Sequence, residues 1–182
     1  MKKLLFACSL IVLITAGFTI VGKKAKDEKV SSNSPSNGKE VKWLSFEEAQ
    51  KLADKNPKKI FVDVYTDWCG WCKKMDKSTL RDPIITEYLD KKYYSVKLNA
   101  ESDKKVVYKG KEITERQLAS KIFKASGYPT TVYLDENLNV LQPISSYLEV
   151  EMLDKILHYY GDDYYKNTSW DTFESVYSKG NN

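Results

Sequence analysis

Residues 60–75, with the sequence IFVDVYTDWCGWCKKM, decide the fold of this chain. Residues 60–65 are mostly apolar and β-branched, which predicts a buried strand. The residues that follow bring Cys69 and Cys72 to the start of a lysine-bearing segment that is predicted to be helical. Cysteines at this spacing face each other in a first helical turn, where free N–H groups and the helix dipole stabilise a thiolate. A strand that leads into Cys-x-x-Cys at a helix start indicates a redox site.

The composition fits one globular domain with extensions at its ends. The chain has 182 residues and a net charge of +4, with basic and acidic residues interspersed throughout. No basic stripe with interleaved aromatic residues is visible, so a nucleic-acid partner is not expected. The 3 cysteines are too few for a disulfide scaffold. Because Cys8 lies in the N-terminal leader, a single pair is left for the mature protein.

The N-terminus has the layout of a secretory segment. Positive residues precede a long apolar run, and Thr15-Ala16-Gly17 offers small residues for cleavage. The run is close to the ~20 residues that span a bilayer, so residues 1–22 are predicted to be a signal peptide or an N-terminal membrane anchor formed by residues 4–21. Cys8 is a weaker candidate for lipidation, because most of the apolar run follows it. Either interpretation predicts an extracytoplasmic, periplasmic domain.

The remaining chain divides into a linker, a domain and an extension. Residues 23–42 are rich in Lys, Ser, Asn and Gly and are predicted to be a flexible linker. Residues 43–161 are predicted to fold. Residues 162–182 form an aromatic-rich C-terminal extension, for which Ser169 predicts a helix N-cap. The extension is expected to pack on the domain, with docking to a partner as the alternative.

Periodicity predicts an alternation of helices and strands within residues 43–161. A capping box at Ser45 predicts the first helix, and the cysteine helix is expected to end near Leu80. Further helices are predicted after Asp82 and Thr114 and over residues 150–160, with strands at 60–65, 93–98, 130–134 and 140–144 and a hairpin at 106–113. The order α, β, α, β, α, β, β, α predicts an α/β fold, a mixed sheet with helices on both faces.

From about Trp43 to Gly161 the chain resembles the thioredoxin superfamily. It is most similar to extracytoplasmic thiol:disulfide interchange members, namely the C-terminal domain of the transmembrane disulfide-reducing interchange protein and the periplasmic thioredoxin associated with sulfur oxidation. The resemblance rests on separated motifs in one order: FVDVYTDWCGWCKKM, DP-I-I, VKLN, VVYKGKEIT with QLASKI, and GYPTTVYLD. It implies a thioredoxin-like fold.

The resemblance also implies roles for the cysteines and for two charged residues. Cys69, nearest the helix start, is expected to be an exposed nucleophile of low pKa, and Cys72 to be the resolving thiol. Asp63 matches a buried acid that takes the proton from the resolving cysteine, and Lys97 matches the lysine beside it. Burial would raise the pKa of such an acid towards that of a useful base. Alternatively, Asp63 and Lys97 are strand residues that face water.

A substrate groove is expected around the cysteines. Pro129 matches the cis-proline that faces them, and the backbone beside it pairs with a substrate strand. Trp68, Gly70, Trp71 and Tyr128 are then expected to bind substrate, although the aromatic residues could instead serve packing. The resemblance departs at residues 145–147, Ser-Ser-Tyr, where family members often have glycine.

Neither a metal nor a cofactor is expected. A structural zinc site needs four ligands, and beyond the cysteine pair the mature chain offers only His158 among His and Cys residues. His158 itself is expected to be an ordinary surface residue. No nucleotide- or flavin-binding motif is visible, so electrons are expected to come from a membrane thiol carrier.

The sequence therefore predicts an extracytoplasmic protein dithiol–disulfide oxidoreductase that acts on protein disulfides. Gly70-Trp71 lacks the histidine found before the second cysteine of strong oxidants, which favours a reducing potential. The alternatives are an oxidant or isomerase of protein disulfides, and a thioredoxin-fold chaperone module that binds exported proteins.

Overall fold

The computed structural model describes residues 40–180. The predicted signal peptide or anchor and most of the predicted linker lie outside these residues. Within the described part of the chain, no helix is both long and apolar enough to cross a membrane.

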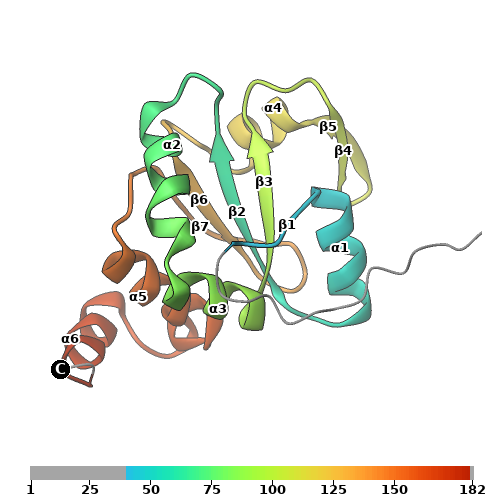
Figure 1. Cartoon of the computed structure of the whole chain (residues 1–182). Coiled ribbons are helices and arrows are strands. Elements are labelled where there is room, and N and C mark those ends of the chain that lie inside the picture. Colours follow the sequence, from blue (N-terminus) through green and yellow to red (C-terminus); the bar gives the residue numbers. More distant parts are fainter. Residues whose placement is uncertain (1–39, 181–182) are drawn as a thin grey trace, which may run out of the picture. The chain divides into compact units, whose positions relative to one another are not determined.

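A mixed sheet forms the centre of the domain (Figure 1). Its 5 strands lie in the spatial order β1 (Trp43–Leu44), β3 (Tyr93–Asn99), β2 (Lys59–Tyr65), β6 (Thr130–Leu134) and β7 (Val140–Ile144). β1 and β2 run parallel to β3, whereas β6 is antiparallel to β2 and to β7. The short strand β1 was not predicted. The predicted hairpin is formed by β4 (Lys105–Tyr108) and β5 (Lys111–Thr114), which pair with each other as a separate sheet.

Helices cover both faces of the sheet, so the predicted α/β fold is confirmed (Figure 1). On one face lie α1 (Phe46–Lys55) and the short α4 (Glu115–Gln117), which continues as the π-helical turn η2 (Leu118–Ile122). The other face carries α2 (Gly70–Lys77), the 3₁₀ turn η1 (Thr79–Arg81), α3 (Pro83–Lys92) and α5 (Val150–Gly161). The cysteine helix α2 thus ends before Leu80.

Alternation along the central strand β2 decides where the site forms. Ile60, Val62 and Val64 pack in the core beneath α1. Successive side chains of a strand point to opposite faces. Phe61 accordingly packs in the opposite core, and Asp63 shares its face, the one that α2 covers. The strand therefore places one carboxylate beneath the cysteine helix.

The helix starts follow the capping residues that the sequence predicted. Ser45 and Glu48 form a reciprocal capping box, with the Ser45 N–H donating to Glu48 at 2.8 Å and the Glu48 N–H to Ser45 at 3.2 Å. Asp82 caps α3 by accepting from the Ile84 N–H at 2.9 Å. Local side-chain chemistry therefore fixes where these helices begin.

The C-terminal residues pack on α5. They form the 3₁₀ turn η3 (Tyr164–Lys166) and α6 (Trp170–Gly180). The Tyr159 ring contacts the rings of Trp170 and Phe173 at centroid distances of 5.2 and 5.1 Å, and its hydroxyl donates to the Thr168 carbonyl at 2.8 Å. These contacts join the extension to the last helix of the sheet domain.

Candidate active site

A tight turn between β2 and α2 brings the two cysteines together. The Cys69 N–H donates to the Thr66 carbonyl at 3.1 Å, and Cys69 then occupies the N-cap of α2. Cys72 lies in the first turn of that helix, where its N–H donates to the Cys69 sulfur at 3.0 Å. The two side chains form a disulfide with an S–S distance of 2.07 Å. The redox pair that the sequence predicted is therefore assembled.

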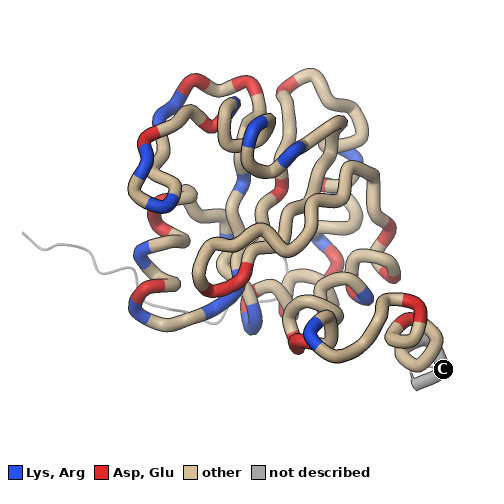
Figure 2. The backbone as a smooth tube through the Cα atoms, turned by 180° about the vertical axis from the view of Figure 1, so that it is seen from behind, with Lys and Arg blue, Asp and Glu red and all other residues tan. Residues whose placement is uncertain are grey.

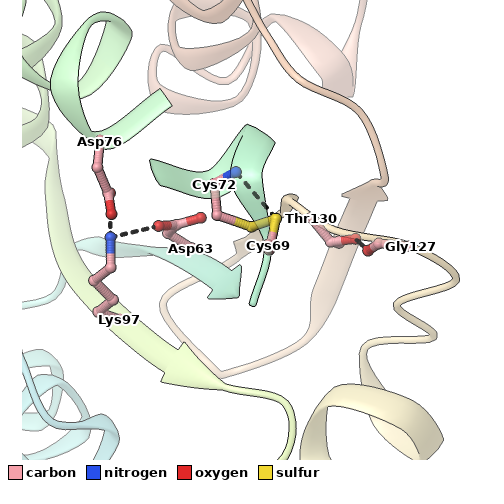
Figure 3. Close-up of a disulfide and its surroundings, with 7 residues drawn as sticks. All are labelled: Asp63, Cys69, Cys72, Asp76, Lys97, Gly127 and Thr130. Carbon is pink, nitrogen blue, oxygen red and sulfur yellow. Dashed lines mark hydrogen bonds and ion pairs between the residues drawn. A yellow bond between two sulfur atoms is a disulfide. The ribbon is translucent and has the colours of Figure 1, made fainter. Parts of the chain in front are cut away.

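Both cysteines are buried in this disulfide form. Each is only 3% exposed, so the prediction of an exposed Cys69 is wrong for this state. Figure 3 shows the disulfide between Asp63 on one side and the segment from Gly127 to Thr130 on the other. The surface at the site belongs instead to Trp68 and Trp71, which are 67% and 58% exposed. In the segment between β2 and α2, the tryptophan side chains therefore face solvent and the cysteine sulfurs face the interior.

Asp63 lies beneath the disulfide and is only 2% exposed (Figure 3). Its Oδ2 atom accepts a hydrogen bond from the Lys97 ammonium at 3.0 Å. Its Oδ1 atom is buried and has no hydrogen-bond partner among the described residues. The alternative that Asp63 faces water is therefore wrong.

Lys97 bridges two carboxylates. Besides Asp63 it binds Asp76, which reaches down from α2 (Figure 3). The Lys97 ammonium also lies 4.8 Å from the centroid of the Trp43 ring and 5.3 Å from that of Tyr65. Its side chain is 22% exposed, so the alternative of a plain solvent-facing lysine is also wrong.

Asp76 was not identified from the sequence as a member of the site. The available signal was its position four residues after Cys72, which places both on one side of a helix. Its partner Lys97 comes from a strand that is distant in sequence, and only the fold reveals the contact.

Burial raises the pKa of Asp63, and the charge of Lys97 opposes that rise only in part. For Lys97, burial acts to lower the pKa, but Asp63 and Asp76 outweigh it and raise the pKa above its ordinary value. Lys97 therefore stays charged, while the Asp63 carboxylate holds a proton more readily than an exposed aspartate.

A cavity of about 320 Å³ adjoins the outer side of this charged group. Lys97 and Asp76 line it, and its other lining residues are Glu40, Val41, Trp43, Leu80 and Arg81. Lys97 and Asp76 therefore border a space that solvent can enter, whereas the buried Asp63 does not line it.

The segment that faces the disulfide is held by hydroxyl groups. The Tyr128–Pro129 peptide bond is cis. The Thr130 hydroxyl donates to the Gly127 carbonyl at 2.6 Å and lies 2.7 Å from the Ser145 hydroxyl. Ser145, which stands where the resemblance led us to expect glycine, thus connects the end of β7 to this segment.

Two pairs of aromatic side chains lie beside the disulfide, Trp68 with Tyr128 and Trp71 with Tyr147, and each pair is called a rim below. On one rim the Trp68 ring meets Tyr128 edge-on at 6.0 Å, and its indole N–H donates to Glu101 at 3.0 Å. On the other rim the Trp71 ring lies 5.3 Å from that of Tyr147. Tyr128 also packs against the core, which confirms the packing role considered for it, while its role in substrate binding stays a prediction.

Gly70 lies between the rims on the open side of the helix start. A Cβ atom built at Gly70 would meet nothing within 4 Å. The space beside this residue is therefore open.

His158 lies elsewhere, among aromatic rings. Its ring lies tilted against that of Tyr88 at a centroid distance of 3.8 Å, and 5.2 Å from that of Tyr177. The expectation of an ordinary surface residue is wrong, because α3 and α6 both contribute rings that pack against it. Within residues 40–180, no group of three or more His, Cys, Asp and Glu side chains is placed to hold a metal ion.

Sequence comparison identifies relatives that are named for thiol–disulfide chemistry. Thiol:disulfide interchange protein DsbD of Haemophilus ducreyi is 32% identical over 88 residues, which cover 48% of this chain and 14% of that protein. Its counterpart from a Haemophilus influenzae strain is 24% identical over 143 residues, which cover 78% of this chain and 23% of that protein. The chain thus spans less than a quarter of the length of these two relatives.

Structural comparison finds the same fold in solved proteins. A thioredoxin from Thermus thermophilus superposes with a TM-score of 0.52 at 19% identity, covering 65% of this chain and 85% of that one. A family model described as a thioredoxin-like domain matches residues 46–161. These residues include the disulfide at the start of α2 and every strand of the central sheet except β1. On this match, the chain belongs to the thioredoxin-like domain family.

Proposed function

We propose that this protein is an extracytoplasmic dithiol–disulfide oxidoreductase that reduces disulfides in other proteins. The observation that carries the proposal is the disulfide at the start of α2, placed directly above a buried carboxylate with one unpartnered oxygen. The names of the interchange-protein relatives support the same chemistry.

In the reduced protein, the Cys69 thiolate would attack a substrate disulfide. One substrate sulfur leaves as a thiol, and Cys69 becomes part of a mixed disulfide. The Cys72 N–H, which already donates to the Cys69 sulfur at 3.0 Å, is placed to stabilise that thiolate together with the start of α2. Cys69 is therefore the proposed nucleophile.

The second step needs Cys72 to lose a proton. We propose that the Oδ1 atom of Asp63 accepts it, because that oxygen is buried and has no hydrogen-bond partner among the described residues. The raised pKa of Asp63 brings it closer to that of a thiol and makes the transfer easier. The Cys72 thiolate then attacks Cys69, the substrate leaves as a dithiol, and the Cys69–Cys72 disulfide forms.

Lys97 would keep Asp63 usable as a base. It binds the Oδ2 atom and leaves Oδ1 available. Lys97 and Asp76 also border the cavity of about 320 Å³, through which water could carry the proton from this group to solvent. The charged group would thus connect the cysteine pair to solvent on the side away from the substrate.

The location and the partners are part of the proposal. The apolar run near the N-terminus supports export to the periplasm, free or anchored through residues 4–21. Substrates would be protein disulfides that bind over Trp68, Gly70, Trp71 and the Tyr128–Pro129 segment. A membrane thiol carrier would return the protein to its dithiol form, and we propose no bound cofactor.

Insulin reduction tests the proposed function. The full chain, kept reduced by dithiothreitol, is expected to accelerate precipitation of the insulin B chain well above the rate with dithiothreitol alone, and Cys69→Ser is expected to abolish that acceleration. If wild type and Cys69→Ser were equally inactive while the wild type still prevented aggregation of unfolded proteins, the chaperone alternative would replace the reductase proposal.

A further inference from the structure

We infer that Lys74, held between the rings of Trp71 and Tyr147, selects substrate segments that carry a carboxylate beside their reactive disulfide. The inference rests on the proposed reductase function and adds a substrate class to it.

The Lys74 ammonium lies between two aromatic rings. It lies 4.9 Å from the centroid of the Trp71 ring and 4.5 Å from that of Tyr147. A cation over an aromatic face is stabilised by the ring quadrupole, so these contacts restrain the lysine without neutralising it. The Tyr147 hydroxyl lies 3.3 Å from both Ser78 and Glu149, which restrains the second ring in turn.

The charge of Lys74 is available to a ligand. The residue is exposed, and among residues 40–180 no carboxylate forms an ion pair with it. Lys97 differs in this respect, because it binds two carboxylates.

Lys74 contacts a side chain from the turn that carries the cysteines. It follows Trp71 by three residues on α2, so both side chains lie on one side of the helix. Trp71 stands between the two cysteines in sequence and is 58% exposed. A substrate residue that packs on Trp71 therefore comes within reach of the Lys74 ammonium.

Two carboxylates lie on the opposite rim. There the Trp68 indole N–H donates to the Glu101 carboxylate at 3.0 Å, and Asp67 accepts from Asn99 at 3.3 Å. The disulfide thus lies between the side at Trp68, where Glu101 and Asp67 are joined by Arg116 on the Glu101 carbonyl, and the side at Trp71, where Lys74 is joined by Glu149 at the Tyr147 hydroxyl. The Lys74 charge places an acidic substrate residue on the Trp71 side, and the two carboxylates disfavour it on the other side.

The expected selectivity is modest, because the pair forms at the surface. An exposed ion pair changes rates by no more than about fivefold. The test uses three disulfide-bonded peptides that are identical except for one residue beside a cysteine, which is Glu, Gln or Lys. With the reduced full chain at low salt, we expect kcat/KM to fall in the order Glu, Gln, Lys, with about two- to fivefold between the first and the last.

Variants assign the selectivity to the proposed contact. Lys74→Glu is expected to reverse the order of the peptides, and Lys74→Arg to preserve it. Lys77→Glu is the matched control, because it changes the net charge equally and Lys77 lies one turn farther along α2. It is expected to leave the order unchanged. A small neutral disulfide reports the intrinsic reactivity of Cys69, which should be the same in all four proteins.

The outcomes separate this inference from the proposed function. Reduction of all three peptides at one rate would overturn the inference and leave the proposed function intact. The same holds if Lys74→Glu slowed every substrate equally, including the neutral one, because Lys74 would then act through the Cys69 thiolate. Failure of the wild type to reduce any of the peptides would overturn both.

Discussion

Asp63 binds Lys97 through one carboxylate oxygen and keeps the other buried beneath the disulfide. The Oδ2 atom lies 3.0 Å from the Lys97 ammonium, whereas Oδ1 has no hydrogen-bond partner among the described residues. Burying a polar atom without a partner costs stability, so a position that keeps one suggests use in the reaction. This relationship leads to two predictions that separate a catalytic acid from a structural one.

Asp63→Asn should slow release of the mixed disulfide by about tenfold or more near neutral pH, because the variant lacks the proton acceptor. The defect should shrink as the pH rises, since Cys72 then loses its proton without help. Stopped-flow measurement of the resolving step across pH tests this. A rate that is unchanged at every pH would mean that Asp63 takes no part in the step.

The same variant should be at least as stable as the wild type at neutral pH. Burial raises the pKa of Asp63, so ionising it costs more in the folded than in the unfolded protein. The wild type therefore loses stability as the pH rises above the ordinary aspartate range and up to the raised pKa, and asparagine removes that loss. Urea midpoints at acidic and neutral pH measure it. A variant that is clearly less stable at neutral pH would indicate a structural carboxylate.

Lys97→Met should destabilise the protein by about 3 kcal/mol at neutral pH, because it leaves Asp63 buried without its charged partner. This value is the lower end of the range for breaking a buried ion pair, since Lys97 is partly exposed. Lys97 holds the pKa of Asp63 down, so removing it raises that pKa further. The destabilisation should grow as the pH rises through the interval above the ordinary aspartate pKa, because only the charged Asp63 needs its partner. Below that interval it should be small.

Lys91→Met serves as the control for this variant, since Lys91 is an exposed lysine near the end of α3. Its urea midpoint should follow that of the wild type at every pH. A loss in Lys97→Met that did not vary with pH would show that the lysine stabilises the fold by packing on Trp43 and Tyr65.

The two cysteines should give different phenotypes. Cys69→Ser should have no reductase activity, because the nucleophile is gone. Cys72→Ser should form mixed disulfides with substrates and release them slowly, since no resolving thiol remains. Mass spectrometry of the adducts measures the trapping and identifies the substrates. Full multiple-turnover activity of Cys72→Ser would exclude the two-thiol mechanism.

Thr130→Val should weaken substrate binding more than the chemistry. It removes the hydroxyl that donates to Gly127 and contacts Ser145, so the segment facing the disulfide loses two restraints. We expect a higher KM for peptide disulfides, an unchanged rate with a small neutral disulfide, and a stability loss of about 1–2 kcal/mol. Equal slowing with both kinds of substrate would show that the hydroxyl acts on the cysteines instead.

Features that depend on local chemistry could be predicted from the sequence. Ser45 and Asp82 cap helices by accepting hydrogen bonds from residues two or three positions later in the chain, so the sequence alone reveals these caps. Cys69 and Cys72 are likewise within one helical turn of each other. The strand pattern of residues 60–65 identified Asp63 as a polar residue in an apolar strand before any contact was known.

Features that depend on contacts between distant segments could not be predicted in the same way. Asp76 meets Lys97 only because the fold brings the side chains of α2 and β3 together, and Lys74 lies between two rings only because Tyr147 reaches α2 from the segment after β7. Cys69 is buried, and the segment of Thr130 that lies beside it is distant in sequence (Figure 3). Basic and acidic residues are interspersed over the domain (Figure 2), so no cluster of charge in the sequence pointed to Asp76 or Lys74.

The reduction potential of the Cys69–Cys72 couple tests the proposed direction of the reaction most directly. The Gly-Trp dipeptide between the cysteines offers no unusual stabilisation of the thiolate, so the dithiol should be a good electron donor. Equilibration with glutathione, followed by thiol alkylation, should give a potential nearer the roughly −270 mV of thioredoxin than the roughly −120 mV of a strong oxidant. A value above about −150 mV on that scale would contradict the reductase proposal.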